Sequence, residues 1–319
     1  MWDLGVDRTL FFMINVQSLT KRYGDTVAVD DLTFNVRPGT VTGFLGPNGA
    51  GKSTTMRMIL GLDRPSGGTA LIEGRPLSGH PAPLAAIGSL LDASALHPRR
   101  SAYDHLWSLA ATNGIPRSRV DVVLDVVGLT EVAHRSGGGF SLGMGQRLGI
   151  AAALLGDPPV IMLDEPVNGL DPEGIQWIRQ LLRGLADEGR TVFVSSHLMG
   201  EMELMAEHFV IIGRGRLVAD ISAVDLRSTT RPERVTVCSH DLTDLVDELR
   251  CEGVTISSKE PGAIDVEGRT AEEIGRLALD AGIALTALIP QQPSLEDIFM
   301  TLTADSVEYH GSDDFVGVA

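Results

Sequence analysis

The 319-residue chain contains only two cysteines, Cys238 and Cys251, and only 5% aromatic residues. Two cysteines cannot build the disulfide framework of a small secreted domain, so we expect a reducing compartment and no bridge between them. No stretch approaches the 18 or more uninterrupted apolar residues that a membrane-spanning helix needs. Residues 1–12 lack a basic segment and a small-residue cleavage site, and they therefore do not resemble a secretory signal.

Basic residues are also scarce, because 26 Lys and Arg stand against 42 Asp and Glu and give a net charge of −16. Nucleic-acid recognition needs a basic surface, so we expect no nucleic-acid partner. The charge is unevenly distributed: residues 1–215 carry 18 basic and 22 acidic side chains, whereas residues 216–319 carry 8 and 20. This change of composition predicts a domain boundary near residues 215–230.

The most informative segment is Gly-Pro-Asn-Gly-Ala-Gly-Lys-Ser-Thr at residues 46–54, which matches the P-loop pattern G-x-x-x-x-G-K-[ST]. An apolar strand pattern precedes it and a helical pattern follows it, as the motif requires. Glycines allow consecutive backbone N–H groups to turn toward phosphate oxygens at the positive end of a helix. We expect Lys52 to reach the β- and γ-phosphates and Ser53 to bind Mg²⁺. The predicted nucleotide-binding residues of this loop are Gly46, Asn48, Gly49, Ala50, Gly51, Lys52, Ser53 and Thr54.

A pair of acids lies downstream, after the apolar residues 160–163. These residues predict a short, fully buried parallel strand. Asp164 at its carboxyl end and Glu165 directly after it lie where open α/β sheets bind their ligands. We expect Asp164 to serve the metal and Glu165 to orient the attacking water.

Apolar runs and turn signals predict an α/β protein in two parts. The first part, residues 13–220, combines short strands, the P-loop, a helix over 54–60 and a mainly helical segment within about 93–155. The second part, residues 221–304, has the order β-α-β-β-α-β, which is the split arrangement of ferredoxin-like domains. The two ends of the chain lack such patterns. We expect residues 1–12 to be a non-structural extension and the acidic residues 305–319 to be a disordered tail.

A third motif, Phe-Ser-Leu-Gly-Met-Gly-Gln-Arg at residues 140–147, resembles the signature loop of ATP-binding cassette (ABC) ATPases. That family prefers Leu-Ser-Gly-Gly-Gln, a basic or polar residue, and Gln-Arg. Four positions match and two depart from the preferred sequence. The matching residues are Ser141, Gly143, Gln146 and Arg147, and the departures are Leu142 and Met144.

Three further positions extend the resemblance over about residues 14–220. Asn168-Gly-Leu-Asp171 is similar to the D-loop, His197 to the switch histidine, and Tyr23 to the aromatic residue that stacks on adenine. The resemblance implies a P-loop NTPase cassette with a parallel-sheet core, an antiparallel β part and a helical signature subdomain. The small α+β domain follows it.

The resemblance also implies an ATPase that binds ATP and Mg²⁺ in a head-to-tail dimer. Ser141 and Gly143 would cover the ATP of the second copy, and Asp171 would link the two sites. Lys52, Glu165 and His197 would be the catalytic residues.

One family position does not match: Asp92 stands where the Q-loop usually has glutamine. A carboxylate is a good Mg²⁺ ligand, so metal contact and a catalytic role can survive. The alternative is that Asp92 lies outside the metal shell and supports only the loop.

Because the chain has no membrane segment of its own, the resemblance implies a separate multispanning permease. We expect a cytoplasmic subunit held peripherally at the membrane through that permease. The C-terminal part, with Leu-Glu-Asp-Ile-Phe at 295–299, resembles the tail of drug, antibiotic or polysaccharide exporters. Two alternatives stay open: an importer subunit, or a soluble ABC ATPase that acts in translation or repair.

Overall fold

The computed structural model describes residues 12–92, 97–229, 234–250, 253–260, 262–291 and 295–303. Nearly all of the predicted N-terminal extension and the whole predicted acidic tail lie outside these ranges. The described chain divides into two compact units, with residues up to Ala223 and residues 302–303 in the first and Val224–Thr301 in the second. Within the described ranges, no helix is long and apolar enough to cross a membrane.

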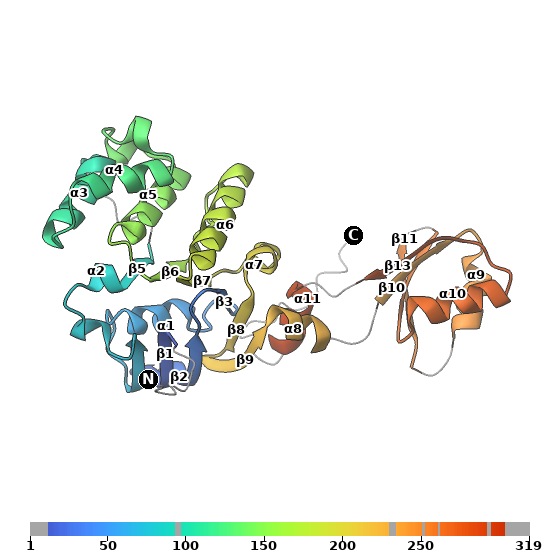
Figure 1. Ribbon diagram of the computed structural model, residues 1–319. Coiled ribbons are helices and arrows are strands. Elements are labelled where there is room, and N and C mark those ends of the chain that lie inside the picture. The colour runs from blue at the N-terminus through green and yellow to red at the C-terminus, as the bar shows by residue number, and fades with distance from the viewer. Residues whose placement is uncertain are drawn as a thin grey trace, which may run out of the picture. The chain divides into compact units, whose positions relative to one another are not determined.

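A six-stranded sheet forms the centre of the first unit (Figure 1). Its strand order is β5-β6-β7-β3-β8-β9. All neighbouring pairs are parallel except β8 and β9, which are antiparallel. In chain order the strands are β3 (Val41–Leu45), β5 (Ile87–Leu90), β6 (Val160–Asp164), β7 (Thr191–Ser195), β8 (His208–Gly213) and β9 (Arg216–Ser222). The predicted strand at 160–164 is therefore one of the buried parallel strands.

A second, antiparallel sheet has the strand order β2-β1-β4 and shares a core with the first. Its strands are β1 (Ile14–Tyr23), β2 (Thr26–Val36) and β4 (Gly67–Ile72). The rings of Phe34, Phe44 and Phe193 come from β2, β3 and β7 and pack with centroids 5.1 to 5.7 Å apart. Helix α1 (Lys52–Ile59) adds Met56 and Ile59 to the same core. This packing fixes the P-loop helix between the two sheets.

The predicted helical segment is a group of helices beside the main sheet in Figure 1. Two of its helices begin at serines whose side chains accept a backbone N–H: Ser101 for α3 and Ser141 for α5. Such caps satisfy N–H groups that the first helical turn leaves unpaired. The helices of the first unit after α1 are α2 (Pro83–Ala86), α3 (Ala102–Thr112), α4 (Ser118–Val126), α5 (Leu142–Leu154), α6 (Pro172–Asp187) and α7 (Met199–Met205).

The second unit has a four-stranded antiparallel sheet in the order β11-β12-β10-β13. Its elements are α8 (Ala223–Thr229), β10 (Arg234–Ser239), α9 (Leu242–Leu249), β11 (Thr255–Glu260), β12 (Ala263–Glu267), α10 (Ala271–Asp280), β13 (Leu285–Gln291) and α11 (Leu295–Thr303). From β10 to β13 the chain follows the β-α-β-β-α-β order expected from the sequence. Apolar residues of β10, β12, α9 and α10 form its own core.

Candidate active site

Four parallel strands of the main sheet end at one edge, and each is followed by a segment with polar residues. The P-loop follows β3, Leu91 and Asp92 follow β5, Glu165 follows β6, and Ser196-His197 follows β7. Parallel strands bring their carboxyl ends together, and open α/β sheets bind ligands at that edge. Segments more than 100 residues apart in the chain therefore meet around one cavity.

Two glycines of the P-loop make close backbone contacts that no other residue allows. A Cβ atom on Gly46 would lie 2.7 Å from the carbonyl oxygen of Ile212. Gly51 has a φ of 101° and directly precedes α1, and a Cβ there would lie 2.5 Å from the carbonyl oxygen of Ala28. The sequence predicted a helix that starts at residue 54. The observed helix starts two residues earlier, at Lys52, directly after this left-handed glycine.

A cavity of about 350 Å³ lies over the loop. Its walls combine P-loop residues and the acid pair with apolar side chains such as Leu91, so a ligand there would meet both polar and apolar groups. The lining residues are Ala28, Pro47, Asn48, Gly49, Ala50, Gly51, Lys52, Ser53, Thr54, Leu91, Asp164 and Glu165.

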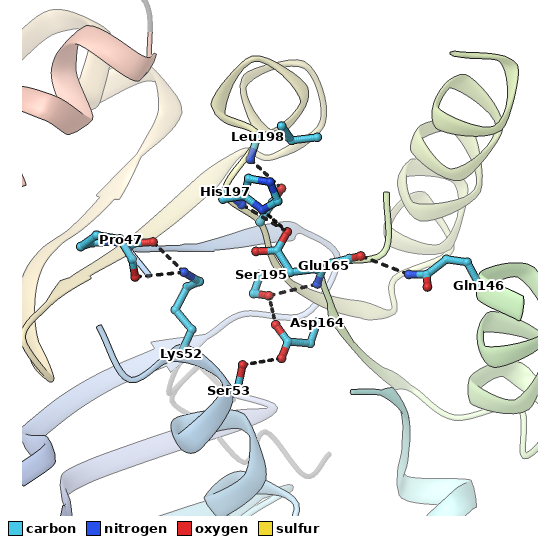
Figure 2. Close-up of polar contacts among 11 residues, drawn as sticks. Pro47, Lys52, Ser53, Gln146, Asp164, Glu165, Ser195, His197 and Leu198 are labelled. Carbon is cyan, nitrogen blue, oxygen red and sulfur yellow. Dashed lines mark hydrogen bonds and ion pairs between the residues drawn. The ribbon is translucent and has the colours of Figure 1, made fainter. Parts of the chain in front are cut away.

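Lys52 is buried, and its ammonium group donates to the loop's own carbonyl oxygens. Nζ lies 2.6 Å from Gly46 O and 3.3 Å from Pro47 O (Figure 2). Burial lowers the pKa of Lys52, while the negative charges of Glu165 and Asp164 oppose this shift. A phosphate group that displaced the two carbonyls would give this buried cation a full negative partner.

Asp164 is held between two serine hydroxyls at the end of β6. Ser53 Oγ donates to Asp164 Oδ2 at 2.7 Å, and Ser195 Oγ donates to Oδ1 (Figure 2). The second contact follows from strand register, because Asp164 pairs directly with Ser195 across β6 and β7. The P-loop serine and the strand-end carboxylate are therefore brought together, as the sequence predicted.

Glu165 has a left-handed backbone, with a φ of 50°. Such a conformation costs a non-glycine residue about 1–3 kcal/mol and persists only where surrounding contacts enforce it. Its N–H donates to Ser195 O at 3.1 Å and to Ser195 Oγ at 3.2 Å. Its carbonyl oxygen accepts from Gln146 Nε2 at 3.1 Å. These bonds fix the direction in which the Glu165 side chain leaves the strand.

The Glu165 carboxylate points toward His197 (Figure 2). Its Oε2 lies 2.7 Å from His197 Nδ1 and accepts the His197 backbone N–H at 3.3 Å. The imidazole is half exposed, whereas the carboxylate is more buried. The arrangement provides a carboxylate that can accept a proton and an imidazole that stabilises it from one side.

Three predicted site residues lie away from the cavity within the same chain. Ser141 caps α5 and accepts from Met144 N at 3.2 Å, and Asp171 caps α6 and accepts from Gly174 N at 2.9 Å. A Cβ on Gly143 would lie 3.0 Å from Gly169 O, so the signature loop touches the D-loop. None of the three is among the cavity-lining residues.

Two other predicted residues are exposed and are not among the cavity-lining residues. Tyr23 ends β1 and is 51% exposed, and its hydroxyl donates to Asp63 Oδ2 at 3.2 Å. Asp92 is exposed and directly follows Leu91, which lines the cavity, although Asp92 itself does not. Its role in binding the metal therefore stays a prediction.

Sequence reasoning missed two residues that support the acid pair, Ser195 and Gln146. The sequence could have indicated Ser195, because this residue ends an apolar run typical of a parallel strand. It also lies two residues before His197. Gln146 had been matched only as part of the signature loop. Its bond to the Glu165 backbone depends on how α5 packs beside β6 and carries no signal in the sequence.

Comparison with protein families yields two matches. Residues 29–168 match the family described as "ABC transporter", and residues 233–296 match "Domain of unknown function (DUF8746)". The first match contains the P-loop, the signature loop and the acid pair.

Relatives and solved structures agree with the first match. The chain is 36% identical to the bacitracin transport ATP-binding protein BcrA of Bacillus licheniformis, over 91% of this chain and 97% of the relative. It is 44% identical to the uncharacterized ABC transporter ATP-binding protein YhcH of Bacillus subtilis, over 65% of this chain and 68% of the relative. A dimeric ATP-binding cassette, solved in a post-hydrolysis state with ADP and Pi, is 26% identical with a TM-score of 0.60; the match covers 66% of this chain and 99% of that one.

These findings confirm the fold, the family and the reaction class predicted from the motifs. The chain belongs to the ATP-binding proteins of ABC transporters, and it is an ATPase of that family.

Proposed function

We propose that two copies of this chain bind two molecules of Mg²⁺-ATP between them and that hydrolysis drives a separate membrane permease that exports an antibiotic-like compound. The observation that carries the hydrolytic part is Asp164, which is bonded to the P-loop Ser53 and is followed directly by the constrained Glu165.

Ser53 of α1 and Asp164 at the end of β6 fit a magnesium ion. Mg²⁺ prefers hard oxygen ligands, and Ser53 Oγ and Asp164 Oδ2 lie 2.7 Å apart beside the cavity. Asp92 is a candidate for a further contact. When bound, the ion would neutralise charge on the β- and γ-phosphate oxygens.

Lys52 and the loop N–H groups hold the phosphates, and Glu165 acts on the water. The Glu165 carboxylate takes a proton from water as the water oxygen attacks the γ-phosphorus. The bond between the γ-phosphorus and the bridging oxygen breaks, leaving ADP and phosphate. His197, bonded to Glu165 at 2.7 Å, keeps the carboxylate in place. In this proposal His197 also contacts the γ-phosphate of bound ATP.

A second copy supplies what one chain lacks. Ser141 is exposed at the start of α5 and outside the cavity of its own chain. A helix start offers N–H groups and a positive dipole end, which suit a phosphate. Ser141 and Gly143 of one copy would cover the ATP of the other, and Asp171 would lie at the joint between the two sites. The dimeric cassette with ADP and Pi supports this pairing.

The export of an antibiotic-like compound is supported by the bacitracin transport protein, whose similarity to this chain extends through the second unit. The permease is a separate polypeptide in this proposal. It would hold the ATPase at the cytoplasmic face of the cell membrane.

The test uses Glu165→Gln, which keeps the side chain's size and removes the base. Mg²⁺-ATP should still bind, because Lys52 and Ser53 are unchanged. Hydrolysis should fall by about 10²–10⁴-fold, as expected for loss of a general base. With uncleaved ATP the protein should elute as a dimer in size-exclusion chromatography, and the parent protein with ADP should elute as a monomer.

Adding Ser141→Arg should abolish that dimer, because the large side chain blocks the γ-phosphate cover while leaving the P-loop intact. The two-copy site would be contradicted if the Glu165→Gln protein stayed monomeric in saturating Mg²⁺-ATP and its complex with the permease also failed to trap nucleotide. Copurification with a multispanning membrane protein, followed by its identification, tests the transport role.

A further inference from the structure

Tyr23, the residue assigned to the adenine base, is held by a carboxylate that the sequence motifs do not include. Tyr23 ends β1, and its hydroxyl donates to Asp63 Oδ2 at 3.2 Å. Asp63 lies in the loop that follows α1, 40 residues farther along the chain. The contact therefore joins the antiparallel sheet to the segment after the P-loop helix.

Asp63 is itself fixed by an arginine of α1. Arg57 Nε donates to Asp63 Oδ2 at 2.8 Å, and Arg57 Nη2 donates to Oδ1 at 3.2 Å. This two-point arrangement restricts the carboxylate plane more than a single bond does. The Arg57 guanidinium holds the pKa of Asp63 below its usual range, so Asp63 stays an acceptor at neutral pH.

The same loop also fixes the cation that lies over the Tyr23 ring. Lys21 Nζ is 4.9 Å from the ring centroid and donates to Arg64 O at 2.7 Å. Cations favour the negative face of an aromatic ring. Asp63 thus holds the ring at its hydroxyl, and Arg64 holds the lysine that lies over one face of the ring. Half of the Tyr23 side chain remains exposed.

Tyr23 is linked through Asp63 to α1, the helix whose first turn lines the nucleotide cavity. The Tyr23 hydroxyl shares the Asp63 carboxylate with Arg57 of α1, the helix that begins directly after the P-loop glycines. Thr54 of the same helix lines the cavity over the P-loop. In the proposed ATP site, a base attached to phosphates in that cavity would reach the Tyr23 ring.

We propose that Asp63 is a positioning residue that holds the Tyr23 ring for stacking on the base, and thereby sets the affinity for nucleotides without contacting the phosphates. This inference rests on the proposed ATP site. A free tyrosine side chain would have to be ordered when the base binds, and a ring that is already held avoids that cost.

The experiment compares Mg²⁺-ATP with Mg²⁺-tripolyphosphate, a probe that keeps the phosphates and lacks the base. Binding of both is measured by calorimetry on the full chain and on Asp63→Ala, Tyr23→Phe and the double variant. Each single variant should weaken ATP binding about 2–10-fold, the range for one hydrogen bond. The double variant should be no weaker than the singles, because all three remove the same bond. Tripolyphosphate binding should stay within twofold of the parent.

Two variants serve as matched controls. Asp63→Asn keeps an acceptor for the Tyr23 hydroxyl and should restore most of the ATP affinity lost in Asp63→Ala. Tyr23→Ala removes the ring and should weaken ATP binding more than any hydroxyl variant. In steady-state hydrolysis the loss in Asp63→Ala should fall mainly on KM rather than on kcat.

The outcomes separate this inference from the function on which it rests. If Tyr23→Ala weakens ATP binding and Asp63→Ala does not, Asp63 does not position the ring and the base site stands. Equal losses for ATP and tripolyphosphate in Asp63→Ala would assign Asp63 to the structure of α1 and overturn the inference. If Tyr23→Ala changes neither ligand, the base-stacking assignment itself is wrong.

Discussion

At the scale of single residues, the P-loop holds its lysine on two of its own carbonyl oxygens. Lys52 Nζ bonds to Gly46 O and Pro47 O, and burial lowers its pKa. A buried ammonium is costly to leave without strong partners. The site is therefore prepared to exchange two neutral acceptors for a charged phosphate, which is the stronger partner.

Lys52→Ala should therefore bind Mg²⁺-ATP about tenfold more weakly or worse, since a bond to a charged group contributes about 1.5–3 kcal/mol. Calorimetry measures the binding, and phosphate release measures the reaction, which should be nearly absent. Lys52→Arg is the matched control, because it keeps the charge and changes its geometry. Hydrolysis near the parent rate in Lys52→Ala would contradict the assignment of the P-loop.

Asp92 permits a test of the predicted metal contact. If Asp92 serves the ion, Asp92→Ala should lower activity and raise the Mg²⁺ concentration needed for half-maximal hydrolysis. Asp92→Gln, which provides an amide oxygen, should keep much of the activity and a Mg²⁺ requirement close to that of the parent. Mg²⁺ titrations of the three proteins provide the measurement. Identical titration curves would favour a role limited to the loop that follows β5.

At the scale of secondary-structure elements, α5 joins the signature loop to the acid pair of the same chain. Arg147 stacks 4.2 Å above the Trp177 ring of α6 and donates to Val127 O at 3.0 Å. Gln146, the preceding residue, donates to Glu165 O. Helix α5, whose start would face the ATP of a second copy, is thus bonded to Glu165, the residue that in the proposed reaction acts on the ATP of its own copy.

The start of α10 allows a test of a local stability element. Thr270 Oγ1 accepts from Glu273 N at 3.2 Å, and Glu273 Oε2 accepts from Thr270 N at 3.0 Å. Thr270→Ala removes half of this capping box and should lower the stability of the second unit by about 0.5–2 kcal/mol. Thr270→Ser keeps the acceptor and should lose less. Equal thermal unfolding of the parent and Thr270→Ala would show that the cap does not stabilise the unit.

The capping box also predicts a pH dependence. The hydrogen bond from the Thr270 backbone holds the pKa of Glu273 below its ordinary 4.5. Since folding lowers this pKa, the stabilisation is present above about pH 4.5 and is lost as the pH falls through the folded value. Glu273→Gln should reduce the acid sensitivity of unfolding near pH 4, measured by circular dichroism. An unchanged pH profile would exclude this contribution.

At the scale of the whole molecule, we propose that residues 13–220 are a complete cassette and residues 221–304 a separable accessory domain. The cavity and its lining residues all lie in the first unit, and the second unit has its own core. A chain ending at residue 225 keeps all of β9 and the bond from Ala223 N to Glu207 O. We therefore expect it to fold cooperatively and to bind Mg²⁺-ATP with the parent affinity.

Circular dichroism and calorimetry on the shortened chain measure both expectations. A chain ending at residue 207 is the control, because it lacks β8 and β9 and should not fold. If the chain ending at 225 also failed to fold, the second unit would be part of the cassette's stability rather than an addition to it.

The sequence by itself determined the local parts of this protein. The P-loop follows from its own nine residues, because consecutive N–H groups and glycines at fixed spacing bind phosphate without help from distant segments. The buried strand before Asp164, the serine cap of α5 and the capping box of α10 are equally local. Hydrophobic patterns also predicted the β-α-β-β-α-β order of the second unit, because alternation and helical period depend on neighbours in the chain.

The tertiary structure decided the contacts between segments that are distant in sequence. Ser195 bonds to Asp164 across 31 residues because β6 and β7 pair in one register, and a shift of that register would remove the bond. Asp63 reaches Tyr23 across 40 residues because α1 packs against the antiparallel sheet. Both contacts depend on how sheets and helices pack. The residues next to a side chain in the sequence do not indicate which distant residue it will contact. Only the folded chain therefore identifies the residues that hold the predicted catalytic and base-binding groups in place.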